Sequence, residues 1–224
     1  MIRLVSILVC GLFALSLPTL SLAGCFDPLE NPSFEATLVP NQNEYDQMPN
    51  WTLTGGMRAV VYGSPGSLST VPVSQDDWGS TYLDGGFSDL AIATQRIEVP
   101  TECESIYDQE YYFLLLEARL GDVASEPDHA EAELRFLNAA DEQLGNILET
   151  GFIPAGTGNS ISSILVCSQF IPSGTRVIEI RVLLVNVNGG RNTAWADNFS
   201  IGLTWPDPVQ PTSWGAIKAR LTAE

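Results

Sequence analysis

Apolar and polar residues alternate along most of the chain with a period of two, which is typical of β-strands with one buried face. The alternation is clearest at 112–118, 132–136 and 178–184, where every second residue is apolar. We predict that these apolar faces form the core. Glycine- and proline-rich turns separate the segments. The pattern predicts strands at 33–39, 51–54, 58–62, 81–83, 90–99, 111–119, 130–137, 144–149, 162–170, 176–187 and 193–203.

Many short strands without helix-length periodicity between them predict an all-β fold, an antiparallel sandwich of two sheets. We expect one domain over 25–204, long enough to bury a sizeable core. Residues 205–224 are expected to be a proline-containing linker followed by a short basic tail. That tail is interpreted either as a frayed end or as an attachment signal read by sorting machinery.

Residues 1–24 are predicted to be an export signal, with Arg3 before an apolar run and small residues at its end. Leu22 to Cys25 match the bacterial lipoprotein signal closely, which predicts a lipid on Cys25 and a membrane anchor through it. The alternative is ordinary cleavage after Ala23. The chain is accordingly expected in the bacterial cell envelope or as a secreted protein.

Four cysteines are present, and Cys10 would leave with the signal. Lipidation of Cys25 leaves Cys103 and Cys167 free to form a disulfide, which an oxidising compartment permits. A second pairing uses Cys25 and leaves one thiol over, and a reduced buried pair is a third alternative.

The formal net charge is −17, which disfavours nucleic acid and anionic lipid as partners. The single histidine, His129, cannot build a histidine-rich zinc site and offers no convincing nucleophile–base arrangement. No glycine loop of the phosphate-binding kind is present. These observations favour a protein that is not an enzyme.

Five different short motifs follow one another along the chain: 31–35 (NPSFE), 49–52 (PNWT), 95–97 (QRI), 112–119 (YFLLLEAR) and 196–201 (ADNFSI). In this order they resemble the galactose-binding-like jelly rolls, the fold of many carbohydrate-binding modules. The resemblance implies a jelly-roll sandwich and a glycan as partner. It also implies a structural calcium ion between the first and last strands, held by Glu35 and Asp197 with Ser33 contributing. The alternative is that these side chains cap turns without a metal.

Aromatic residues are divided between core and surface. Trp51 and Trp195 lie in core-type motifs and are expected to pack. Trp78, Tyr82 and Tyr111 are the candidates for stacking on a sugar ring.

A Glu-x-Arg pattern occurs on the polar face of three predicted strands, at Glu117 and Arg119, Glu133 and Arg135, and Glu179 and Arg181. If the strands are neighbours, these charges form either a ladder of ion pairs or a platform that binds sugar hydroxyls. The predicted ligand-binding set therefore adds Glu117, Arg119 and Arg181 to the aromatic residues.

Together, these patterns predict an exported, surface-anchored, non-catalytic module that binds carbohydrate. The alternatives are a structural or adhesive cell-surface protein without a small ligand and, third, an enzyme acting on polysaccharide.

Overall fold

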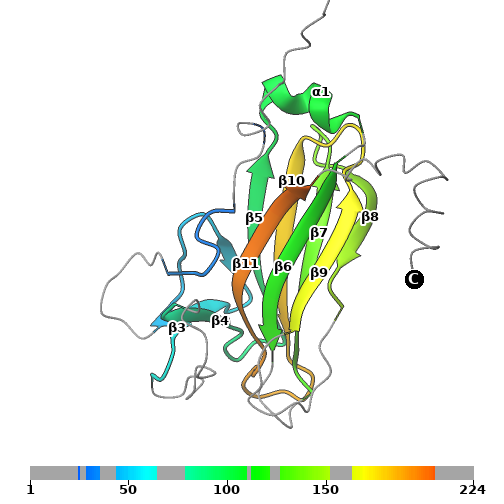
Figure 1. Cartoon of the computed structure of the whole chain (residues 1–224). Coiled ribbons are helices and arrows are strands. Elements are labelled where there is room, and N and C mark those ends of the chain that lie inside the picture. Colours follow the sequence, from blue (N-terminus) through cyan, green and yellow to red (C-terminus); the bar gives the residue numbers. More distant parts are fainter. Residues whose placement is uncertain are drawn as a thin grey trace, which may run out of the picture.

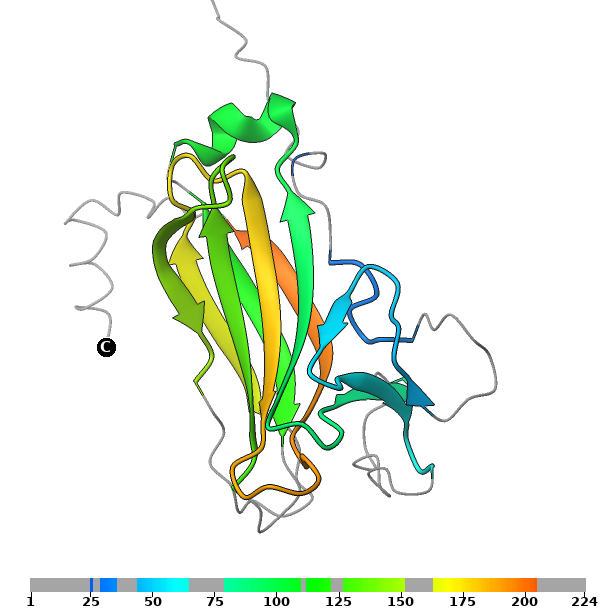
Figure 2. The same ribbon diagram turned by 180° about the vertical axis from the view of Figure 1, so that it is seen from behind.

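The computed structural model describes residues 25, 29–35, 44–64, 79–109, 112–121, 127–151 and 163–204, and it confirms the predicted fold class. Two antiparallel sheets pack face to face as a sandwich (Figures 1 and 2). A 3-10 helix, η2 (Thr101–Cys103), and a four-residue helix, α1 (Glu104–Tyr107), cap one end of it.

The six-stranded sheet runs in the order β1-β3-β4-β11-β6-β9 and the five-stranded sheet in the order β2-β5-β10-β7-β8. Figure 1 views the sandwich from the side of β11, β6 and β9, and Figure 2 views it from the side of β5, β10 and β7. The strands are β1 (Glu44–Tyr45), β2 (Thr52–Thr54), β3 (Arg58–Val61), β4 (Thr81–Asp84), β5 (Leu90–Glu98), β6 (Phe113–Gly121), β7 (His129–Leu137), β8 (Gln143–Glu149), β9 (Ser163–Phe170), β10 (Val177–Val185) and β11 (Trp195–Thr204).

The core lies between the sheets and consists of the faces that the alternation predicts. On the central strands every second side chain is almost fully removed from water, while its neighbours along the strand are half exposed. The buried set includes Leu114, Leu116, Leu134, Phe136, Ile178, Ile180 and Val182. Burial of this apolar surface is the main driving force for folding.

The predicted first strand at 33–39 is wrong over Ser33–Glu35, which the structure shows as a turn, and 36–39 lie outside the described residues. The backbone N–H of Phe34 donates to the carbonyl of Asn31 at 3.2 Å, and Phe34 has a φ of 59°. A residue at this φ cannot continue a strand. The turn directs the Phe34 ring into the core, where the side chain is fully buried.

The two motif segments from opposite ends of the chain do lie side by side, as the resemblance predicts. The ring centroids of Phe34 and Phe199 are 5.8 Å apart, and Trp51 lies 5.2 Å from Phe34 and 6.0 Å from Phe199. The backbone N–H of Phe199 also donates to the carbonyl of Pro32 at 2.9 Å. This aromatic cluster confirms the packing role expected for Trp51.

Cys25 and residues 29–35 form what we call the N-terminal strap, which connects the two sheets without being a strand of either. On the five-stranded side, the buried side chain of Gln95 in β5 pairs with the backbone of Glu30, with both hydrogen bonds at 2.8 Å. On the six-stranded side, the strap bonds to Phe199 in β11 and to Thr81 in β4, whose hydroxyl donates to the Phe34 carbonyl at 2.8 Å. The Gln95 amide thus replaces the ladder partner that a strand would provide.

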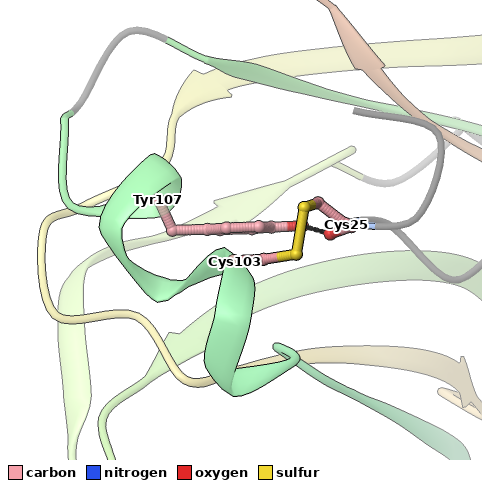
Figure 3. The surroundings of a disulfide bond; sticks show 3 residues. All are labelled: Cys25, Cys103 and Tyr107. Atoms are coloured by element: carbon pink, nitrogen blue, oxygen red, sulfur yellow. Dashed lines mark hydrogen bonds between the residues drawn. A yellow bond between two sulfur atoms is a disulfide. The ribbon is translucent and has the colours of Figure 1, made fainter. Parts of the chain in front are cut away.

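Cys25 forms a disulfide with Cys103 at the end of the sandwich capped by α1 (Figure 3). The predicted Cys103–Cys167 disulfide is therefore wrong in its partner. Lipidation of Cys25 stays a prediction and is an alternative to this bond, because a sulfur bonded in a disulfide has no valence left for a thioether-linked lipid. Strand alternation carries no information about the position of Cys25, which precedes the first strand.

The predicted export signal at 1–24 and the predicted tail at 205–224 lie outside the described residues. Within the ranges that the structure describes, no helix is long and apolar enough to cross a membrane.

Candidate functional site

Glu35 ends the N-terminal strap with its carboxylate held against the start of β4. The backbone N–H groups of Ser80 and Thr81 donate to Oε1 at 2.7 and 2.9 Å, and the Ser80 hydroxyl donates to Oε2 at 2.5 Å. Gly79 permits this approach, because a Cβ at that position would lie 2.2 Å from Oε1. The carboxylate is therefore fixed by donors from a single short segment.

Asp197 lies in β11 with its side chain fully buried. The Tyr62 hydroxyl donates to Oδ2 at 2.8 Å, and the backbone N–H of Asn198 donates to Oδ1 at 2.7 Å. Burial, with a smaller contribution from the charge of Glu35, raises the pKa of Asp197 to about 8 against the lowering effects of these hydrogen bonds and of the Arg119 charge. Burial and the charge of Asp197 likewise raise the pKa of Tyr62.

The structure thus places Glu35 near enough to Asp197 for its charge to act on that carboxyl group. A β-bulge, seen as a register shift between Asp197 and Ser200, interrupts β11 where the strap meets it. A carboxylate offers about four lone-pair sites, so the bonded oxygens keep capacity for a cation. Across the described ranges, no three side chains of His, Cys, Asp or Glu gather as a metal cluster. Backbone or other oxygens would have to complete a calcium shell.

The outer face of the five-stranded sheet carries a row of charges. Glu133 in β7 is its centre: Oε2 accepts from Arg135 Nη2 at 2.7 Å and from Arg181 Nη1, on the neighbouring β10, at 2.8 Å. Arg96 in β5 pairs with Asp141 and lies 3.7 Å from Glu179 Oε2. This is the cross-strand ladder of ion pairs, the first of the two sequence interpretations.

Next to the charges, β5 and β10 carry apolar side chains on the same outer face. Ile92 lies opposite Leu183, and Leu90 lies opposite Val185. Leu90 is exposed, while Ile92, Leu183 and Val185 are half-buried. We call these four residues the apolar row. It runs toward the loops that join β4 to β5 and β10 to β11.

Those two loops meet at the end of the apolar row and carry further exposed apolar side chains. Phe87 is 78% exposed and Val187 is 54% exposed. Hydrogen bonds from Asn186 N to Asp89 O at 2.9 Å and from Asn192 N to Gly86 O at 2.8 Å hold the loops together. Buried Asn192 adds a bond from its side chain to Leu184 O at 2.9 Å. The loops therefore present Phe87 and Val187 on a supported surface.

The predicted platform of six charges does not exist. Glu117 and Arg119 lie on β6, which belongs to the six-stranded sheet, whereas Arg181 lies on β10 in the other sheet. Their side chains point to opposite outer faces of the sandwich. Glu117 accepts from the Ser200 hydroxyl at 3.3 Å, and Arg119 lies opposite Asp197. Alternation assigns a side chain to a face of its own strand but does not say which strands are neighbours.

The predicted stacking role of Tyr82 is also wrong, because its side chain is only 1% exposed. Tyr82 packs with Val60, Trp195 and Tyr62 in a second small cluster on the six-stranded sheet, and its ring centroid lies 4.7 Å from that of Tyr62. Buried Trp195 is a packing residue, as expected. Trp78 and Tyr111 lie outside the described residues.

Sequence reasoning missed Phe87 and the apolar row. The signal for Phe87 was available: a lone aromatic in the turn Gly85-Gly86-Phe87-Ser88, between two strands. The apolar row had no such signal, because Leu183 and Val185 look like further core positions in a nearly continuous apolar strand.

No protein-family model matches the chain, and no curated protein sequence matches it. Solved structures do resemble it. The enzymatically active domain of tailspike protein 4 from bacteriophage CBA120 has a TM-score of 0.50 and 20% identity, over 79% of this chain and 21% of that chain. The chain thus spans about a fifth of the length of that solved tailspike chain. A cyclase from Fischerella sp. TAU has a TM-score of 0.52 and 12% identity, over 80% of this chain and 96% of that one.

At these identities the likeness shows the fold alone, because one β-sandwich architecture hosts unrelated functions. Carbohydrate-binding modules also stand among the similar structures. TmCBM61, solved with β-1,4-galactotriose, has a TM-score of 0.46 and 14% identity, over 79% of this chain and 97% of that chain.

Proposed function

We propose that this protein is an exported, non-catalytic module that binds a neutral glycan on the outer face of the five-stranded sheet. The observation that carries the proposal is the juxtaposition there of the apolar row with a row of hydrogen-bonding charged side chains. Sugar rings present C–H groups on their faces and hydroxyls around their edges. A surface with apolar side chains beside ordered polar groups matches both.

Phe87, exposed in the loop three residues before Leu90, would extend this surface at the loop end. An aromatic ring offers a flat apolar plane for the C–H face of a sugar. Exposed apolar patches bounded by polar residues mark interaction sites more often than chance exposure does. Phe87 thus takes the role that the sequence interpretation gave to Tyr82.

The charges favour an uncharged ligand. Every arginine in the described part of the chain pairs with or faces a carboxylate: Arg58 and Arg191 with Asp84, Arg96 with Asp141, Arg119 with Asp197, Arg135 and Arg181 with Glu133, and Arg176 with Asp108. An acidic glycan would have to displace these carboxylates. It would also approach a chain with a net charge of −17. A neutral polysaccharide meets neither obstacle.

Calcium at Glu35 and Asp197 is part of the proposal, as a structural ion. Both side chains supply the oxygen ligands that calcium prefers, and a cation beside exposed Glu35 would compensate the charge of the buried Asp197 carboxylate. Ser33 would contribute from the strap turn that also carries Glu35. The ion would join the strap to β11 and would supply no chemistry to a ligand.

The test is retention in native gels containing neutral polysaccharides (xylan, β-1,4-galactan, mixed-linkage β-glucan) or acidic ones (alginate, polygalacturonate). We expect retention by at least one neutral polymer and by neither acidic one. Leu183→Asp should abolish the retention, because a charge would replace the centre of the apolar row.

The matched control is Ser200→Asp, which places the same side chain on the exposed part of the opposite sheet and should leave retention unchanged. Equal retention of both variants would contradict the proposed surface. If no glycan retards the folded chain at all, the glycan proposal fails and the adhesive alternative takes its place.

A further inference from the structure

Cys25 lies in the hydrophobic core. Its residue is 5% exposed, and Cys103 and Tyr107 are 1% and 2% exposed. The Tyr107 hydroxyl donates to the backbone carbonyl of Cys25 at 2.8 Å, so α1 holds the backbone as well as the sulfur at this point (Figure 3). A buried carbonyl with a hydrogen-bond partner and a buried sulfur with a covalent partner together make a docking site for Cys25.

The rest of the N-terminal strap makes few backbone hydrogen bonds to the sheets. Over the seven residues 29–35, its contacts are made by side chains and single backbone bonds, without a strand ladder. Trp51 Nε1 lies 3.2 Å from the carbonyls of both Glu30 and Asn31. Short segments with few backbone bonds open easily unless they are tied down.

We propose that the Cys25–Cys103 disulfide acts as a clasp: once formed by oxidation in the exported chain, it holds the N-terminal strap to the end of the sandwich that α1 caps. The same sulfur that the sequence motif offers to lipid is used for this bond. The clasp closes a loop of 78 residues, which restricts the unfolded chain strongly.

The chemistry is thiol–disulfide exchange with an oxidant of the protein-disulfide class. The Cys25 and Cys103 thiols lose two protons and two electrons and form one S–S bond. The oxidant's disulfide takes up the two protons and two electrons and becomes two thiols. The reaction therefore belongs to an oxidising compartment, which agrees with export of the chain.

The first experiment is mass spectrometry of the full chain, expressed with its own N-terminus in a bacterial host that exports it. Without reduction, proteolysis should release a peptide in which Cys25 is linked to Cys103, and iodoacetamide should label Cys167. After reduction it should label all three cysteines. A diacylglycerol mass on Cys25, or a Cys103–Cys167 peptide, would overturn the proposal.

The second experiment tests the clasp. Cys25→Ser and Cys103→Ser should each lower Tm by about 5–15 °C, and the double variant by no more than either single one. Cys167→Ser is the control and should leave Tm unchanged. Additive losses in the double variant would contradict a bond between these two residues.

If the serine variants fail to fold, reduction of the unaltered chain takes their place. Reduced protein should exchange the amide hydrogens of Glu30 and Phe199 at least tenfold faster, with those of β10 unchanged. Equal protection of Glu30 and Phe199 before and after reduction would show that the disulfide does not hold the strap.

Discussion

Among the carboxyl groups in the described part of the chain, Asp197 has the pKa that is shifted furthest from its ordinary value, and its surroundings explain the shift. The fold removes it from water, places Glu35 near it, and provides the Tyr62 hydroxyl and the charge of Arg119 as partial compensation. Without a bound cation, such a group favours its protonated form. The residue that the motif singled out is thus unusual in its physical setting as well.

The raised pKa of Asp197 makes stability depend on pH in the metal-free protein. The pKa is about 8 in the folded chain against an ordinary value of 3.8, so the folded state holds a proton that the unfolded state has lost. Stability from this group should be complete below about pH 4 and lost as pH rises toward 8. Urea unfolding at pH 4, 6 and 8 in EDTA should show this fall, and Asp197→Asn should remove it. An identical pH slope in the variant would refute the assignment.

Gly79 is the second residue with a specific consequence. Its φ is +67°, and a Cβ there would lie 2.2 Å from Glu35 Oε1. Gly79→Ala should therefore lower the free energy of unfolding by about 2–3 kcal/mol through backbone strain and displacement of the carboxylate. Gly189→Ala is the matched control, with a φ of +75° and an open Cβ position, and should cost about 1 kcal/mol. If both variants lose the same free energy of unfolding in urea, the missing side chain of Gly79 is not what allows Glu35 to approach.

At the scale of elements, alternation predicted the long strands well. The segments at 90–99, 130–137 and 162–170 match β5, β7 and β9 within a residue or so, because one buried face imposes a period of two on the sequence. Alternation did not predict the N-terminal strap. Its backbone is held by Gln95, Trp51 and Thr81, and side-chain hydrogen bonds of this kind leave no periodic trace. The four-residue α1 is too short to show a helical period.

The charged row on β7 and β10 depends on Glu133. Because Glu133→Gln leaves Arg135 and Arg181 without their shared carboxylate, it should lower the free energy of unfolding by about 1–2 kcal/mol. Glu179→Gln, at the 3.7 Å contact with Arg96, is the control and should change it by less than about 0.5 kcal/mol. Chemical denaturation of both variants measures the difference. A larger loss in the control would contradict the central place of Glu133.

For the whole molecule, the sequence predicted the layers and the meeting of the two end motifs, but not which strands are neighbours. The same Glu-x-Arg pattern occurs on β6, β7 and β10, yet β6 lies in the other sheet. Strand order depends on which connections cross from one sheet to the other. The turn residues in a connection do not indicate which sheet the next strand joins. For the same reason Cys25 could not be paired with Cys103 from spacing alone.

Calcium should act on the molecule as a whole, because Glu35 and Asp197 lie on the strap and on β11, which are far apart in the chain. Adding 1 mM calcium to EDTA-treated protein should raise Tm by several degrees, as binding only to the folded state requires. Asp197→Asn should abolish that rise, and magnesium should reproduce little of it. No change of Tm with calcium would leave the two carboxylates as turn-capping groups.

The most direct test of the glycan proposal compares two exposed phenylalanines by titration calorimetry with the neutral polymer that binds best. Phe87 lies at the loop end of the apolar row, and Phe170, which is 48% exposed, ends the edge strand β9 of the other sheet. Phe87→Ala should weaken binding about tenfold, or ~1.4 kcal/mol, while Phe170→Ala leaves it unchanged. Weaker binding after Phe170→Ala with Phe87→Ala unaffected would contradict the account.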